Sequence, residues 1–130
     1  MAANKEEIQP HMWYIEMPSA DVQQSVRFYE GVFGWNIRHR DTVRPSFDAN
    51  AGAVSGAWTT GRKPAADGGP LIYVWVPSVN EALTRVESHG GEIVEGTRPD
   101  SPGTTCYIAK FRDPSGNLIG VYHEESASPA

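Results

Sequence analysis

Aromatic side chains recur at alternate positions in several short runs of the chain, a pattern that could form one wall of a binding site for a planar molecule. Successive residues of a β-strand point to opposite faces, so residues two positions apart share a face. Tyrosine and tryptophan add a hydroxyl or an N–H group to a large apolar surface, which suits them to ligand pockets. The residues in this aromatic phase are Met12, Tyr14, Glu16, Gly56, Trp58, Leu71, Tyr73, Trp75, Leu118, Gly120 and Tyr122.

The opposite phase of the same runs is aliphatic, as in Ile72, Val74 and Val76. This division predicts that the aliphatic face packs under helices while the aromatic face lines a cavity. Two other interpretations of the aromatic face remain, because such stripes also occur in cores and in dimer interfaces. Likewise, Gly56 and Gly120 either leave room for a ligand or mark bulges and close backbone contacts.

Glu16 is the carboxylate that this phase places among aromatic residues. Apolar walls disfavour the charged form of a carboxylate, and a group held in this way can serve as a general acid or base. The alternative is a salt bridge to an arginine such as Arg38, or a solvated position at the rim. A site built from Glu16, His39 and Glu124 is a further alternative, although no spacing supports it.

The rest of the sequence excludes several classes of protein. The chain has 130 residues, 39% of them hydrophobic, a net charge of −5 and no run of basic residues, so we expect no nucleic-acid partner. No apolar stretch approaches the ~20 residues that span a bilayer, so we expect no membrane partner. The single cysteine, Cys106, excludes an internal disulfide and fits a reducing cytoplasm. Phosphate-loop, dinucleotide-binding and serine-hydrolase motifs do not occur.

The elements that must position the aromatic residues are repeated along the chain. Residues 52–58 and 116–122 both read Gly-x-x-x-Gly-x-aromatic, sixty-four positions apart. An apolar 0, 4, 7 pattern typical of a helix starts at Val22 and recurs fifty-seven positions later at Val79. A duplicated module predicts two similar half-sheets that enclose a site between them.

The patterns predict the order βαβββ twice, which indicates an α+β fold with helices outside a cupped mixed sheet. Asp21 and Ser78 are expected to cap the two helices, and Gly34 is expected to end the first. We expect one domain over residues 11–124, with modules at about 11–60 and 70–124 and disordered tails at 1–10 and 125–130. The expected strands are residues 12–17, 35–39, 45–48, 53–59, 71–76, 92–95, 105–111 and 117–123.

The chain resembles the vicinal oxygen chelate superfamily, which holds glyoxalase I, bleomycin-resistance proteins and extradiol dioxygenases. Residues 27–35 (Arg-Phe-Tyr-Glu-Gly-Val-Phe-Gly-Trp), the glycines at 90–91 and residues 111–118 (Phe-Arg-Asp-Pro-Ser-Gly-Asn-Leu) carry the resemblance. It covers residues 12–124. The resemblance implies paired βαβββ modules that form a cupped sheet, and often a homodimer. It does not imply one activity, because the superfamily hosts unrelated chemistries.

Glyoxalase-like members hold a divalent metal with one ligand from the first strand and one from the last strand of each module. Aligned by the neighbouring motifs, these four positions fall on Tyr14, Gly56, Leu71 and Gly120. Two glycines and a leucine offer no ligating side chain, and a neutral tyrosine is a poor ligand. We therefore expect no metal and no other cofactor, and a cup whose lining is the aromatic phase.

The favoured hypothesis is a metal-free member that binds a small aromatic or apolar molecule, for instance to sequester a drug as bleomycin-resistance proteins do. A second hypothesis is a lyase or oxidoreductase of the glyoxalase or dioxygenase type, with non-standard metal ligands or with Glu16 as acid–base catalyst. A third is an interaction module whose exposed aromatic residues form a protein interface. The sequence leaves open whether the protein is an enzyme.

Overall fold

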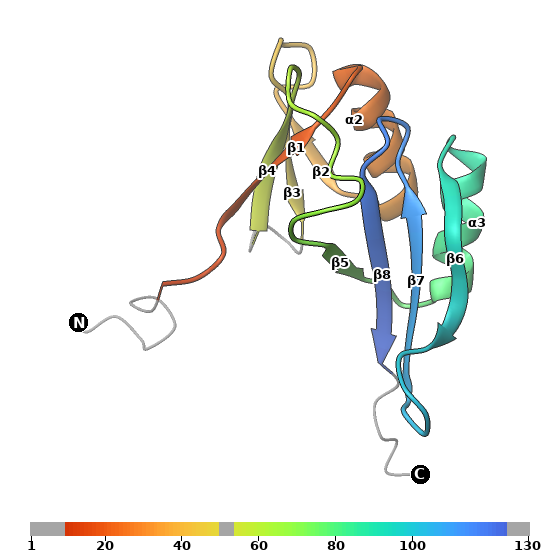
Figure 1. Cartoon of the computed structure of the whole chain (residues 1–130). Helices are drawn as coiled ribbons and strands as arrows, with labels where there is room; N and C mark the ends of the chain where they lie inside the picture. Colours follow the sequence, from red (N-terminus) through yellow and green to blue (C-terminus); the bar gives the residue numbers. More distant parts are fainter. Residues whose placement is uncertain (1–9, 50–53, 125–130) are drawn as a thin grey trace.

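The computed structural model describes residues 10–49 and 54–124. Except for Pro10, the predicted tails at 1–10 and 125–130 lie outside these residues, as does Gly52 of the sequence repeat. The described chain forms two βαβββ modules with one helix each, so the predicted α+β class and module order are confirmed. Figure 1 shows the first module in orange to yellow-green and the second in green to blue.

The first module contains β1 (Tyr14–Pro18), α2 (Val22–Phe33), β2 (Asn36–Arg38), β3 (Ser46–Ala49) and β4 (Val54–Thr59). These strands form a four-stranded sheet, sheet 1, in the order β1-β4-β3-β2. Strand β1 runs parallel to β4, while the other two pairs are antiparallel. Strand β1 is therefore an edge strand of a mixed sheet.

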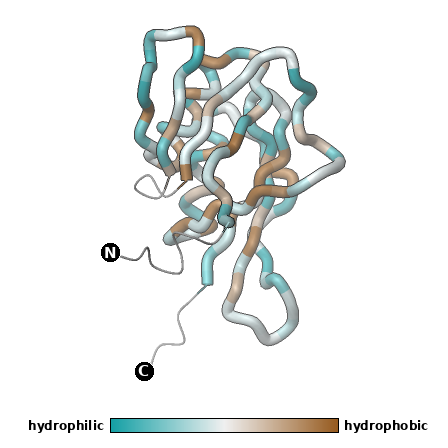
Figure 2. The backbone as a smooth tube through the Cα atoms, turned by 90° about the vertical axis from the view of Figure 1, so that its left-hand side faces the viewer, coloured by the Kyte–Doolittle hydropathy of each residue, from teal (hydrophilic) through white to brown (hydrophobic). Residues whose placement is uncertain are grey.

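The second module repeats this plan with β5 (Ile72–Trp75), α3 (Val79–Ser88), β6 (Glu92–Pro99), β7 (Cys106–Arg112) and β8 (Leu118–Glu124). Its sheet, sheet 2, has the order β5-β8-β7-β6, again with the first strand at the edge and parallel to the last. Strand β6 is longer than predicted because it continues through two register shifts opposite β7. The polar loop between β6 and β7 projects from the lower end of the molecule in both views (Figures 1 and 2).

Local sequence chemistry fixes the helix ends as predicted. The Asp21 carboxylate accepts a hydrogen bond from the backbone N–H of Gln24 at 3.1 Å, and the Ser78 hydroxyl accepts one from Glu81 at 3.2 Å. Each bond satisfies one of the N–H groups that the first helical turn leaves without a partner. Gly34 ends α2 with φ at 69°, a left-handed conformation that glycine adopts without a Cβ penalty.

The hydrophobic core lies between the two helices and the sheet faces that they cover. Phe28 of α2 packs on Phe111 of β7, so the core is continuous between the modules. A buried polar network also joins them, because Tyr29 donates a hydrogen bond to Asp113 at 2.7 Å. Asn117 donates to the same carboxylate at 2.9 Å and to the carbonyl of Pro18 at 2.7 Å. The Asp-Pro-x-Gly-Asn segment therefore fastens the start of β8 to the end of β1.

No helix of the described chain is long and apolar enough to cross a membrane.

Candidate functional site

Sheet 1 has one face covered by α2 and one face that points away from α2, which we call the outer face of sheet 1. The strand register shows which side chains share this outer face. Its members form two rows across the sheet, since residues paired in register share a face. Hydrogen bonds to Asp48 from Ser55 (2.7 Å) and Asn36 (3.1 Å) confirm that the first row lies on one side of the sheet, and the contact of Arg38 with Asp48 (2.9 Å) places Arg38, from the second row, on the same side. The rows are Tyr14, Ser55, Asp48 and Asn36, and then Glu16, Ala57, Ser46 and Arg38.

These donors make the outer face of sheet 1 a hydrogen-bonded polar surface. The hydrogen bonds from Ser55 and Asn36, aided by Arg38, lower the pKa of the Asp48 carboxyl below its usual range. Tyr14 lies at the β1 edge of this face with 44% of its surface exposed. The predicted alternation is therefore correct for Tyr14 and Glu16, which share this face.

The predicted facing of Gly56 and Trp58 is wrong. Gly56 pairs with Phe47 and Ile15, and Trp58 pairs with the buried Met17, all on the side covered by α2. Trp58 is 1% exposed and its ring packs on those of Phe47 and the α2 residue Tyr29. Both residues belong to the core beneath the helix, and the outer face has Ser55 and Ala57 instead.

The wrong facing of Gly56 and Trp58 has a simple geometric cause. The glycine motif repeats after sixty-four residues, but structurally equivalent positions of the last strands repeat after sixty-three. Phe47 and Phe111 are equivalent core residues of the third strands, and they pair with Gly56 and with Ile119 respectively. Gly120 is therefore the counterpart of Ala57, sixty-three positions away, not of Gly56 at sixty-four. Because strands alternate with a period of two, a slip of one residue moves every side chain to the other face.

Sheet 2 has the aromatic outer face that the sequence predicts. Tyr73 pairs with Gly120, and Trp75 with Tyr122, on the side opposite to the core residues Ile119 and Val121. The Tyr73 ring lies over Gly120, where an added Cβ would overlap it. The side chains of Tyr73 and Trp75 are 42% and 58% exposed. Leu71 lies just before β5 and is half-buried.

Tyr122 is tied to its own sheet. Its hydroxyl donates to a carboxylate oxygen of Glu124 at 2.8 Å and lies 4.0 Å from the Cys106 sulfur. The hydrogen bond to Glu124 raises the pKa of Tyr122 well above its usual value. In this hydrogen bond the phenol is the donor.

Glu16 has arginine neighbours, not the aromatic walls expected from the sequence. Its carboxylate oxygens lie 3.1 Å from an Arg44 nitrogen and 3.3 Å from an Arg62 nitrogen. The hydrogen bond of Arg44 to the Tyr14 hydroxyl, followed by its interactions with Glu16, raises the pKa of Arg44 above the normal value. The acid–base role of Glu16 stays a prediction, and the salt-bridge alternative is correct in kind, with Arg44 and Arg62 in place of Arg38.

A cleft of about 1310 Å³ runs between the modules, on the helix side of sheet 1 and along the edge strand β5. Its first wall consists of apolar residues from sheet 1 and the end of α2, and β5 forms the second. Two of the predicted site residues, Tyr73 and Trp75, line this cleft. Tyr14, by contrast, lies on the outer face of sheet 1. The apolar lining of the two walls together comprises Ile15, Met17, Val32, Phe33, Trp35, Phe47, Ile72, Val74 and Val76. The cleft is also lined by the polar residues Glu30, Asn36, Asp48 and Arg85.

The residues at the family's four metal positions do not fit a divalent ion. With the corrected register these are Tyr14, Ala57, Leu71 and Gly120, of which only the tyrosine has a side-chain oxygen. That hydroxyl interacts with Arg44, a cation that repels a metal ion. Across residues 10–49 and 54–124, His, Cys, Asp and Glu side chains nowhere gather in a group of three or more that could hold a metal.

Sequence reasoning missed Arg44 and Arg62. Both are in irregular segments, where no periodicity shows which way a side chain points. The only available signal was composition, since the segments 38–44 and 60–70 contain basic residues at the ends of predicted strands.

Comparison with known families identifies the class of protein. Residues 11–121 match the model of the Glyoxalase/Bleomycin resistance protein/Dioxygenase superfamily, and the chain belongs to this superfamily. The resemblance found in the sequence is thereby confirmed. The comparison with curated protein sequences finds no significant match.

Solved structures share the fold at low sequence identity. An integron cassette protein from Vibrio cholerae is 24% identical with a TM-score of 0.64, over 90% of this chain and 97% of that one. The fosfomycin resistance protein FosX from Listeria monocytogenes is 15% identical with a TM-score of 0.74, over 92% and 97%. A glyoxalase/bleomycin resistance protein/dioxygenase family enzyme from Burkholderia phytofirmans is 14% identical with a TM-score of 0.72, over 86% and 97%.

Proposed function

We propose that the chain binds a small, apolar or aromatic molecule in the cleft between its two modules, without the aid of a metal. The observation that carries this proposal is the cleft of about 1310 Å³, which is large enough for a ligand of drug size. Its lining is mostly apolar, with Glu30, Asp48 and Arg85 as its charged members, and Tyr73 and Trp75 supply large aromatic surfaces with a hydroxyl and an N–H group. Such a lining favours a planar compound that stacks on one ring.

Exposure at β5 supports the same conclusion. Trp75 is 58% exposed although most of its neighbours in the cleft are apolar. A ligand that covers a large exposed aromatic side chain removes apolar surface from water, and this burial stabilises the complex. Sequestration of the bound molecule requires no reaction, which agrees with a lining that is mostly apolar and aromatic.

Titration of ¹⁵N-labelled protein with 2-naphthamide, a neutral planar probe, tests the proposal. We expect shifts of the Trp75 indole N–H signal and of the backbone amides of β5, with binding weakened about tenfold or more in Trp75→Ala. Val43→Ala is the control, because Val43 is also an exposed apolar residue (97%) but does not line the cleft. Equal affinities of both variants and the wild type would contradict the proposal, as would shifts confined to residues outside the cleft.

We also propose that two copies of the chain associate. Strands β1 and β5 each leave one edge without a strand partner among the described residues, and unpaired edges readily accept another strand. Met12 and Trp13, just before β1, are 78% and 71% exposed, as expected of residues that a second copy covers. Sedimentation over a range of concentrations checks this: a monomer mass at every concentration would refute it, and Trp13→Glu is expected to shift a dimer toward monomer.

A further inference from the structure

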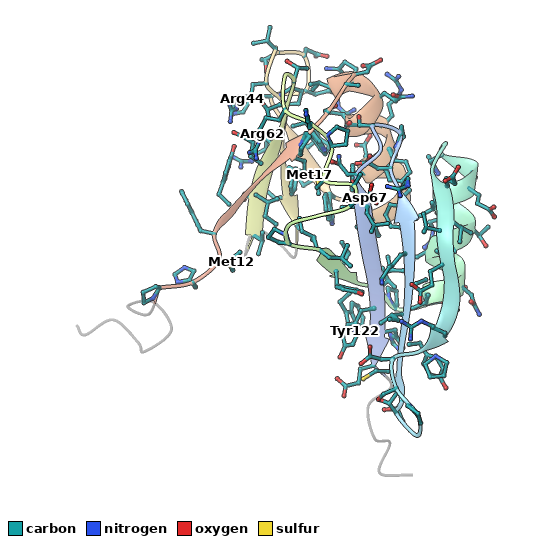
Figure 3. The ribbon with its side chains drawn as sticks, in the orientation of Figure 1. Met12, Met17, Arg44, Arg62, Asp67 and Tyr122 are labelled. Carbon is teal, nitrogen blue, oxygen red and sulfur yellow. The ribbon has the colours of Figure 1, made fainter. Side chains whose placement is uncertain are left out.

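We propose that Arg44 and Arg62 form a binding site for a small oxyanion, a carboxylate or phosphonate, on the outer face of sheet 1. This site goes beyond the proposed function, because none of its residues lines the cleft between the modules. Figure 3 shows both arginines beside each other, over the side of sheet 1 that faces away from α2. Met17, in the same strand as Glu16 but in the opposite phase, is directed to the interior in that view.

The two guanidinium groups come from separate segments and meet at one carboxylate. Arg44 precedes β3, whereas Arg62 follows β4, yet each lies within 3.3 Å of a different oxygen of Glu16. The hydroxyl of Tyr14, in the same strand as Glu16, also interacts with Arg44. Glu16 thus shows that this pair of cations accepts a carboxylate between them, and it fixes their positions before any ligand arrives.

The pair keeps donors for a second anion. A guanidinium carries five N–H donors in a planar fork that matches the oxygens of a carboxylate or phosphonate. Arg44 and Arg62 each use one nitrogen on Glu16 and leave 56% and 63% of their side chains exposed. An oxyanion with two or three oxygens can therefore bridge both groups from the solvent side.

Charge on this face also favours an anion. In the ion pairs of this face, the carboxylates of Glu16 and Asp48 meet the cations of Arg38, Arg44 and Arg62, so these five groups carry one net positive charge in a chain whose net charge is −5. Arg38 is engaged with Asp48 at 2.9 Å, which leaves the excess on the Arg44–Arg62 pair. A local positive patch on an acidic protein concentrates small anions there and repels cations.

Phenylphosphonate is the probe, titrated into ¹⁵N-labelled protein at low ionic strength while the arginine Nε–Hε signals are followed. We expect the signals of Arg44 and Arg62 to move together, and binding to weaken about five- to tenfold in Arg44→Gln and in Arg62→Gln. Arg27→Gln, which removes the same charge from an exposed position on α2, is the matched control and is expected to bind like the wild type. Inorganic phosphate distinguishes recognition of the oxyanion alone from recognition of the phenyl group.

Glu16→Gln supplies the opposite change, because it removes the competing negative charge and keeps a hydrogen-bond acceptor. We expect about threefold tighter binding of phenylphosphonate, and a loss of affinity with added salt in all variants. Benzyl alcohol, the neutral comparison, should leave both arginine signals in place. The proposal is overturned if the Arg44 and Arg62 variants bind like Arg27→Gln, if benzyl alcohol moves the same signals, or if phenylphosphonate fails to bind at millimolar concentration.

Trp75→Ala separates the two proposals. It is expected to leave phenylphosphonate binding unchanged, since Trp75 is in sheet 2 and lines the cleft. Loss of phenylphosphonate binding in Trp75→Ala would show that the probe occupies the cleft, which would overturn the oxyanion site and leave the cleft proposal standing.

Discussion

Gly56→Ala is expected to destabilise the protein far more than Gly120→Ala. A Cβ at position 56 would overlap the backbone carbonyl oxygen of Ile15 and lie 2.5 Å from the Phe47 ring. Neither neighbour can move freely, because Ile15 is in the β1–β4 ladder and Phe47 is 1% exposed. At position 120 the added Cβ meets the ring of Tyr73, a side chain that is 42% exposed and can rotate toward solvent.

The magnitude follows from the kind of neighbour. Inserting atoms into a packed core costs about 1–3 kcal/mol, and a contact with backbone places Gly56→Ala at the upper end, about 3 kcal/mol. Gly120→Ala has the same change in chain entropy and a movable neighbour, so we expect a loss below about 1 kcal/mol. For a chain of this size each kcal/mol shifts Tm by about 3–6 °C, so the two variants should differ by roughly 10 °C.

Urea denaturation followed by far-ultraviolet circular dichroism measures both variants against the wild type. Because the two substitutions are chemically identical and both positions are in the last strand of a module, each serves as the control for the other. A loss of stability for Gly120→Ala that equals or exceeds that for Gly56→Ala would refute the pairing of Gly56 with Phe47 and Ile15, and with it the assignment of Gly56 to the helix side.

Two further substitutions probe the polar contacts. Tyr29→Phe removes the hydroxyl that donates to the buried Asp113, so we expect the free energy of unfolding, measured by urea denaturation, to fall by about 1–3 kcal/mol. Tyr107→Phe is the control, because it removes a hydroxyl that has no hydrogen-bond partner in the described structure, and it should leave the free energy of unfolding nearly unchanged. The pKa of Asp48 is lowered in the folded state, so its contribution to stability is present above the unfolded pKa of about 3.9 and is lost as the pH falls through the lower, folded pKa. Asp48→Asn is therefore expected to be less stable than the wild type at pH 7, by a margin that shrinks toward pH 3; a margin independent of pH would contradict the ion pair and hydrogen bonds described for this carboxylate.

The sequence predicts the helices well because their ends depend on contacts three or four residues away. The capping bonds of Asp21 and Ser78 and the left-handed Gly34 all depend on local chemistry. Strands are predicted with similar success as segments, since apolar alternation and turn residues are also local. The extension of β6 to Pro99 was missed because its pairing with β7 passes through bulges that no local pattern marks.

The candidate site could be predicted only where the alternation had a fixed starting point. In sheet 2 the Asp-Pro turn at Asp113 sets the phase of β8, and the aromatic face of Tyr73, Trp75 and Tyr122 is found as expected. In sheet 1 a glycine repeat sets the predicted phase of β4, and the two matching glycines, Gly56 and Gly120, are not structurally equivalent. The Arg44–Glu16–Arg62 contacts depend on two irregular segments, whose conformations are set by tertiary packing.

The corrected register changes what the duplicated modules mean for function. Equivalent positions on the two outer faces are Glu16 and Tyr73, and Ala57 and Gly120. The same fold therefore presents a charged, hydrogen-bonded surface on sheet 1 and an aromatic one on sheet 2. A shared metal would need donors at equivalent positions of both modules, whereas these two surfaces suit two separate ligands, an oxyanion on sheet 1 and a planar apolar molecule at β5. This pair of surfaces can therefore supply non-covalent contacts to small molecules, and among the described residues it lacks the side chains that would chelate a metal ion.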